Sequence, residues 1–347
     1  MQEVDSIIQK ISPFGFDLFE EAFNKPEKAE SLYNVFEQYI SDLEKQGRAS
    51  TAERYRCSLN SFIKFDKDAD FDTVDKDWLD NYEAWFLEQA KDKKGLKKNS
   101  LTTVGINTRS LRIIFNIAKN KGITENYPFG KNAYSPPGGH NIKKALGLDE
   151  IQKIKEYKAE HKSPEDMARD LWMFSYFSNG MNIKDICSIK EKDIKGSLES
   201  IEFLREKTQR SRRTSAKKIE VIIIPETKAI IEKWCAFTKD PDNYIFPFFN
   251  KADTPKMKRD KTIQLIGTVN KYLKRIAGKL NLQQNITTYH ARHSYASILK
   301  ESGAPIEYIS ETLGHTSTQT TEAYLKSFSR VHREKWAEAL RGNKQEE

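Results

Sequence analysis

Apolar residues recur every three or four positions along most of this chain, and that spacing predicts a largely helical protein. In the first third, apolar stripes predict four helices, over 32–43, from about 51 to 63, over 76–90 and over 99–121. Gly122 is placed to end the fourth helix. Four helices packed within one short stretch of chain predict a compact all-helical domain.

The composition changes at 127–140, where three prolines and three glycines disfavour both a packed helix and a strand. Further helices are expected at 146–157, 165–178, 183–194, 225–238, 261–280, 288–302, 305–313, 318–328 and 331–341. Two β-rich runs, 200–205 and 220–224, bracket a basic segment and predict a hairpin or a three-stranded sheet. We therefore predict a mainly α fold with a small β-sheet. It comprises a short N-terminal segment (1–30), an all-helical domain (31–126), a linker (127–145) and an α+β domain (146–347).

Charge and cysteine content narrow the class of protein. The 347 residues carry a formal net charge of +8, which favours a polyanionic partner, nucleic acid before membrane. Cys57, Cys187 and Cys235 are isolated, so we expect reduced thiols in a cytoplasmic protein and neither a disulfide framework nor a zinc site. No signal peptide opens the chain and no apolar run is long enough to span a membrane, so no membrane partner is expected.

Candidate chemistry concentrates between 286 and 325. This stretch holds His290, Arg292 and His293, then a Leu-Gly-His ending at His315, then Tyr324. An arginine and imidazoles can hold and protonate a phosphodiester, and a phenol can attack it. The residue types therefore favour phosphoryl transfer on a nucleic acid.

The runs TYHARHSYA and LGHTSTQTTEAYL resemble the tyrosine recombinase (phage integrase) family, and the resemblance extends from about 31 to 341. The nine-residue spacing of His315 and Tyr324 is specific to it. The integrases of Bacteroidetes mobile elements resemble this chain most closely. The resemblance implies a SAM-like core-binding domain at 31–126 and a catalytic domain with a C-terminal exchange helix that docks on a neighbouring subunit.

The resemblance also implies roles for individual residues. Tyr324 would be the nucleophile that forms a 3′-phosphotyrosyl enzyme, and Arg292 would grip the scissile phosphate through its planar fork. His315 would donate a hydrogen bond to a phosphate oxygen. Lys207 resembles the mobile-hairpin lysine that protonates the leaving oxygen, although Lys217 or Lys218 would fit the basic segment too. Structural alternatives are a core tyrosine, a surface ion pair and a loop histidine. The family's route requires no metal and no cofactor.

Two positions depart from the family pattern. Tyr289 occupies the first position of the HxxR motif, where a phenol can still donate to phosphate, and His293 would orient the site rather than contact DNA. The family's first arginine follows a glycine by two residues, but GMN places Asn182 there. Because asparagine brings no charge, either another cation, with Lys184 and Arg169 as candidates, replaces it, or activity is reduced.

Basic residues outside the site are candidate DNA contacts, with solvated surface as the alternative. They are Lys97, Lys98, Arg109 and Arg112 in the first domain, Arg210, Arg212 and Arg213 between the strands, and Lys271 and Lys274 on the 261–280 helix.

The resemblance predicts a site-specific DNA recombinase of a mobile element. Monomers in solution would form a homotetramer on double-stranded attachment sites, exchange strands through a Holliday junction, and use accessory DNA-bending proteins. The alternatives are a DNA-binding regulator with a lost site, which Asn182 favours, and a type IB topoisomerase.

Overall fold

The computed structural model describes residues 31–89, 100–130, 132–138, 145–205, 218–315, 317–322, 333–334 and 337–338. The chain forms two compact units, 1–140 and 141–347. The described residues of the first unit form four helices: α3 (Leu32–Lys45), α4 (Ala49–Phe65), α5 (Lys76–Glu88) and α6 (Leu101–Asn120). Three of them begin at a side-chain cap, since Ser31, Asp75 and Ser100 each accept a hydrogen bond from a backbone N–H three residues on.

The core of the first unit is rich in aromatic side chains. Phe36, Phe62, Tyr82 and Phe115 are fully buried, and the Phe62 and Tyr82 rings lie 4.7 Å apart. Asn107 of α6 donates to the Tyr82 hydroxyl at 2.8 Å, which satisfies a polar group inside this core. The apolar stripes seen in the sequence are therefore the buried faces of these helices.

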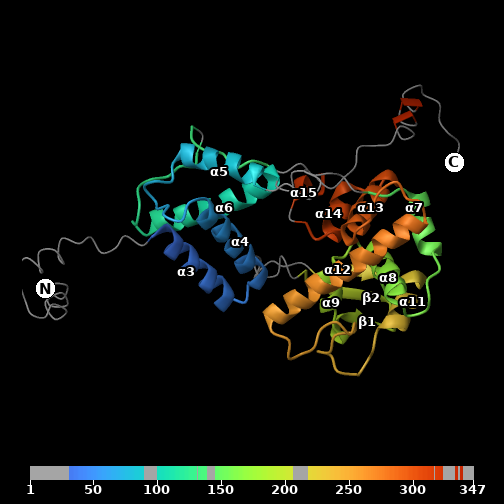
Figure 1. Ribbon diagram of the computed structural model, residues 1–347. Helices are drawn as coiled ribbons and strands as arrows, with labels where there is room; N and C mark the ends of the chain where they lie inside the picture. The colour runs from blue at the N-terminus through green and yellow to red at the C-terminus, as the bar shows by residue number, and fades with distance from the viewer. Residues whose placement is uncertain are drawn as a thin grey trace, which may run out of the picture. The chain divides into compact units, whose positions relative to one another are not determined.

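The second unit is mainly helical and carries a small sheet (Figure 1). Within its described residues the helices are α7 (Leu148–Glu156), α8 (Pro164–Phe177), α9 (Ile183–Ser188), η1 (Glu191–Asp193), α11 (Pro225–Trp234), α12 (Pro255–Lys279), α13 (Thr288–Glu301), α14 (Ile306–Thr312) and α15 (Thr318–Glu322). Helix α8 is central, because α7, α11, α12 and α13 all pack on it. Its apolar residues, with Trp172 fully buried, match that position.

The sheet is antiparallel with strand order β1 (Ile194–Lys195), β2 (Ser200–Phe203) and β3 (Ile219–Ile222). Ile201 pairs with Val221, and both are fully buried. The three-stranded alternative of the sequence prediction is thus the observed one.

Three helix boundaries differ clearly from the prediction, one of them the end of α11 at Trp234 rather than at 238. Helix α12 begins at Pro255 rather than near 261, because Thr254 caps it by accepting from the Met257 N–H. Helix α9 ends at Ser188 rather than at 194, because the chain turns to pair Lys190 with Tyr244 and then enters β1. Among the described residues, no helix is both long and apolar enough to cross a membrane.

Candidate active site

Arg292 lies buried on α13 and forms hydrogen bonds with two segments that are distant in the sequence. Its Nη1 donates to the carbonyl oxygen of Gly180 at 2.9 Å, and its Nη2 donates to that of Leu313 at 2.5 Å. Gly180 has φ +62°, and a Cβ there would stand 2.9 Å from the Arg292 Cα. Only glycine lets the turn after α8 approach the arginine this closely.

His315 lies beside Arg292, as the sequence motif predicted. Its Nε2 is 3.1 Å from Arg292 Nη2, and its Nδ1 is 2.8 Å from the hydroxyl of Thr321. Thr321 is fully buried on α15, so this hydroxyl fixes one side of the imidazole. Thr321 is not among the site residues predicted from the sequence, although it lies three residues before Tyr324.

The other candidates on α13 divide between surface and core. Tyr289 is 43% exposed, and its ring meets the ring of buried His293 edge-on at 4.7 Å. His290 is also buried, but its Nδ1 accepts from the Thr287 N–H and so caps the start of α13. His293 therefore supports Tyr289 from beneath, whereas His290 shapes the helix end.

Arg205 lies two residues beyond β2 and is a cation that is not among the predicted site residues. It is 9% exposed, and its Nη1 donates to the carbonyl oxygens of Leu313 at 3.2 Å and Gly314 at 3.4 Å. Its Nε lies 3.9 Å from Asp185 Oδ2 on α9. Two arginines thus share the Leu313 carbonyl, a proximity that no local sequence pattern encodes.

The position of the family's first arginine holds an uncharged residue at the start of a helix. Asn182 is the N-cap residue of α9 and is half-buried. Asn179 has φ +54°, donates to the Glu220 carbonyl and accepts from the Tyr295 hydroxyl, so it joins α8, β3 and α13.

Arg169 does not replace the missing arginine. Its Nη2 lies 2.7 Å from both Asp166 Oδ1 and Asp170 Oδ1, and its Nη1 donates to the Tyr157 carbonyl at 2.5 Å. Two buried carboxylates therefore hold it in a separate cluster. Lys184, the other candidate, is half-buried in the first turn of α9.

Several predicted residues lie outside the described part of the chain: Tyr324, Lys207, Lys97, Lys98, Arg210, Arg212 and Arg213. Of the remaining DNA-contact candidates, Arg109 donates to the Pro137 carbonyl at 3.0 Å, and Arg112 is half-buried. Lys271 and Lys274 are exposed on α12.

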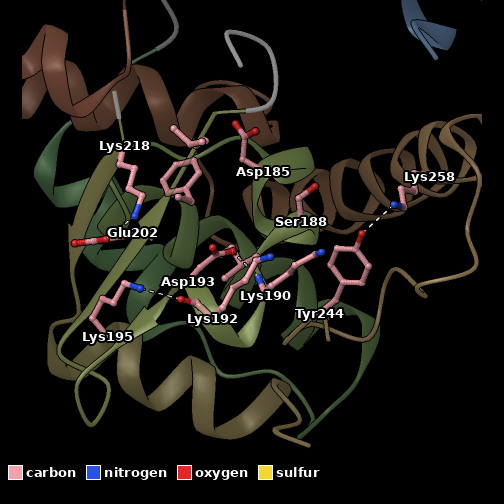
Figure 2. Close-up of a pocket in the computed structure, with 13 residues that line it drawn as sticks. Asp185, Ser188, Lys190, Lys192, Asp193, Lys195, Glu202, Lys218, Tyr244 and Lys258 are labelled. Carbon is pink, nitrogen blue, oxygen red and sulfur yellow. Dashed lines mark hydrogen bonds and ion pairs between the residues drawn. The ribbon is translucent and has the colours of Figure 1, made fainter. Parts of the chain in front are cut away.

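A pocket of about 690 Å³ is lined in part by Asp185, the carboxylate that lies beside Arg205. Figure 2 shows the side chains of Lys190, Lys192, Lys195, Lys218 and Lys258 around this pocket. Part of their charge is balanced by carboxylates, since Lys190 and Lys192 share Asp242, whose pKa their hydrogen bonds lower to about 2. The wall nonetheless carries more lysines than carboxylates and suits a polyanion.

Comparison with known proteins settles the family. Residues 31–134 match the phage integrase SAM-like domain, and residues 144–330 match the phage integrase family. The chain belongs to the phage integrase family. This confirms the predicted tyrosine recombinase family and fold class, with a SAM-like N-terminal domain and an integrase catalytic domain.

This integrase-family chain resembles curated tyrosine recombinases along most of its length. It is 24% identical over 310 residues to tyrosine recombinase XerA of Pyrococcus horikoshii, covering 87% of this chain and 92% of that protein. It is 23% identical over 325 residues to tyrosine recombinase XerC of Leptospira interrogans, covering 92% and 96%.

Solved structures share its fold. The Tn1549 transposon integrase in complex with transposon right end DNA aligns with a TM-score of 0.58 and 15% identity, covering 89% of this chain and 99% of that one. A lambda integrase dimer bound to a COC′ core site aligns with a TM-score of 0.59 and 18% identity, covering 86% and 97%.

Proposed function

We propose that this protein is a site-specific DNA recombinase that cleaves and rejoins DNA through a 3′-phosphotyrosyl bond at Tyr324. The observation that carries the proposal is the convergence of Arg292 and His315, 3.1 Å apart, in a chain of the phage integrase family. Integration and excision of a mobile element, of the Bacteroidetes kind, is the proposed biological role. Relatives bound to transposon-end and core-site DNA support it.

Arg292 is proposed to hold the scissile phosphate. Its carbonyl partners fix the plane of the guanidinium, and a phosphate oxygen would replace part of these contacts when DNA binds. The Tyr324 phenol loses its proton to solvent and attacks phosphorus, while the 5′-oxygen leaves with a proton from Lys207. The phosphotyrosyl bond then retains the energy needed for rejoining.

Thr321 lets His315 change its role during this reaction. While Arg292 donates to Nε2, the imidazole carries its proton on Nδ1 and donates to Thr321. Donation to a phosphate oxygen requires a proton on Nε2, and Nδ1 must then accept from Thr321. A hydroxyl can donate or accept, so Thr321 supports both tautomers.

DNA binding is proposed to use both domains, 31–126 and 146–347. The candidate phosphate contacts are the basic residues named above and the lysine pocket beside Asp185. Monomers would assemble as a homotetramer on two duplexes with the help of DNA-bending proteins. Binding should weaken steeply as salt rises, because phosphate contacts release counterions.

Covalent capture tests the proposal. A pool of nicked random-sequence duplexes is incubated with the full chain, and DNA attached to protein is isolated under denaturing conditions. Wild type should select a sequence and form an adduct, Tyr324→Phe should form none, and Tyr308→Phe, on an exposed α14 tyrosine, should match wild type. Sequence-specific binding without an adduct would support the regulator instead, and relaxation of any plasmid by a monomer would support the topoisomerase.

A further inference from the structure

We propose that Arg205 supplies the second guanidinium to the scissile phosphate and so replaces the arginine absent at Asn182. This inference rests on the proposed recombinase function. Its basis is that Arg292 Nη2 and Arg205 Nη1 both donate to the carbonyl oxygen of Leu313, at 2.5 and 3.2 Å. Two guanidiniums that reach one oxygen are close enough to grip the oxygens of one phosphate.

The surrounding residues build a place for Arg205. Gly314 has φ +63°, and a Cβ there would lie 2.5 Å from Ile219 Cδ1 and 3.4 Å from Arg205 Cδ. The turn after α14 therefore packs directly against β3 and the stem of the arginine. Asp185 approaches the Nε edge from α9, and both of these side chains are nearly buried.

Arg205 reaches the site by a different route from the family's first arginine. Asn182 starts α9, and Asp185 lies in the first turn of the same helix. A side chain from position 205, beyond β2, is thus anchored against the helix from which position 182 projects. Position 205 thus supplies a cation from the end of the strand, whereas position 182 at the start of the helix is uncharged.

The charge of the cluster fits the reaction. Arg292, Arg205 and Asp185 together carry a formal charge of +1, which complements the single negative charge of a phosphodiester. Attack by a phenolate adds a second negative charge at the phosphoryl group. A second guanidinium therefore stabilises the transition state more than the bound substrate, and its loss should slow cleavage more than it weakens binding.

A methylphosphonate substrate tests this role. The nicked duplex captured by wild type is prepared with either a phosphate or an uncharged methylphosphonate at the scissile position. On phosphate, Arg205→Ala should lower the rate of covalent attachment about 100- to 1,000-fold, with DNA binding nearly unchanged. On methylphosphonate, Arg205→Ala should approach the wild-type rate, because attack on the uncharged group develops only one negative charge, which Arg292 can neutralise without a second guanidinium.

Two further variants keep the test decisive. If Arg205→Ala unfolds, Arg205→Lys retains the stem and charge and should show a smaller defect with the same substrate dependence. Asn182→Arg combined with Arg205→Ala should recover at least about tenfold in rate, because it restores the family's cation. Lys228→Ala, exposed on α11, serves as the control.

An equal defect of Arg205→Ala on both substrates, or none on either, would overturn the assignment. Failure of wild type to attach to any duplex would instead reject the recombinase function itself.

Discussion

Two arginines in the second unit, Arg169 and Arg292, are held in opposite ways. Arg169 meets carboxylate oxygens of Asp166 and Asp170 at 2.7 Å, and Lys233 also pairs with both aspartates. These four side chains sum to zero formal charge. Arg292, in contrast, donates to the carbonyls of Gly180 and Leu313.

The difference separates a structural arginine from one suited to bind an anion. Carboxylates neutralise a guanidinium and fix it in place, so the Arg169 cluster stabilises the fold around α8. Carbonyl oxygens orient a guanidinium without cancelling its charge, which suits the guanidinium to bind a phosphate. The kind of partner distinguishes the two sites.

Exchanging each arginine for alanine should affect different properties. Arg292→Ala is expected to lower the rate of covalent attachment about 100- to 1,000-fold, because the phosphate loses its main cation. Arg169→Ala is expected to lower the free energy of unfolding by about 3 kcal/mol, because it leaves buried carboxylates under-compensated. Attachment kinetics and urea unfolding measure the two effects.

Lys155→Ala is the control, because Lys155 forms only a surface ion pair with Glu226. It should change the free energy of unfolding by less than about 0.5 kcal/mol. The comparison breaks down if Arg169→Ala loses activity at full stability, or if Arg292→Ala retains activity.

Glycine substitutions probe the carbonyl that holds Arg292. Gly180→Ala should lower the free energy of unfolding by about 3 kcal/mol, because strain at positive φ adds to overlap with Arg292. It should also slow covalent attachment to DNA. Gly303 has φ +86° and open space where a Cβ would be added. Gly303→Ala should therefore lower the free energy of unfolding by only about 1 kcal/mol and leave the rate of attachment unchanged. Equal effects of the two variants on the rate of attachment would show that the close approach of Gly180 to Arg292 is not needed by the site.

Thr321 should matter through its hydroxyl. Thr321→Val preserves shape but removes the partner of His315 Nδ1, and we expect about tenfold slower attachment. Thr321→Ser should restore most of the rate. Rate-versus-pH profiles of the three proteins should differ on the limb governed by the imidazole, whereas a purely structural role would leave the profile unchanged.

The Arg169 cluster should also give a modest acid dependence of stability. Burial opposes ionisation of Asp166, but hydrogen bonds from Lys233 and the Lys162 N–H and the charge of Arg169 outweigh it and lower the pKa. A lowered folded-state pKa contributes stability above the unfolded value of about 3.9, and this stability is lost as pH falls through the folded value. Urea unfolding from about pH 5 to 3 should therefore show a shallower decline in Asp166→Asn than in wild type.

The sequence predicted the elements that local patterns determine. The apolar stripes located the helices, and the motif brought Arg292 and His315 together before any coordinates were considered. Thr254 and Pro255 were visible signals for the earlier start of α12, but the end of α9 depends on pairing with Tyr244, far along the chain.

The place of Arg205 in the site could not be predicted from the sequence. Among the seven basic residues from 205 to 218, nothing local distinguishes the one that reaches the Leu313 carbonyl. The same limit explains why Arg169 was a candidate: its aspartates at 166 and 170 are close in sequence, but only packing shows that both face it.

The most direct test of the account is to identify the residue that becomes attached to DNA. The adduct captured by wild type is digested with nuclease and trypsin, and the nucleotide-bearing peptide is sequenced by mass spectrometry. We predict a single 3′-phosphoryl linkage to Tyr324. A linkage to any other residue, or to a 5′-phosphate, would contradict the account.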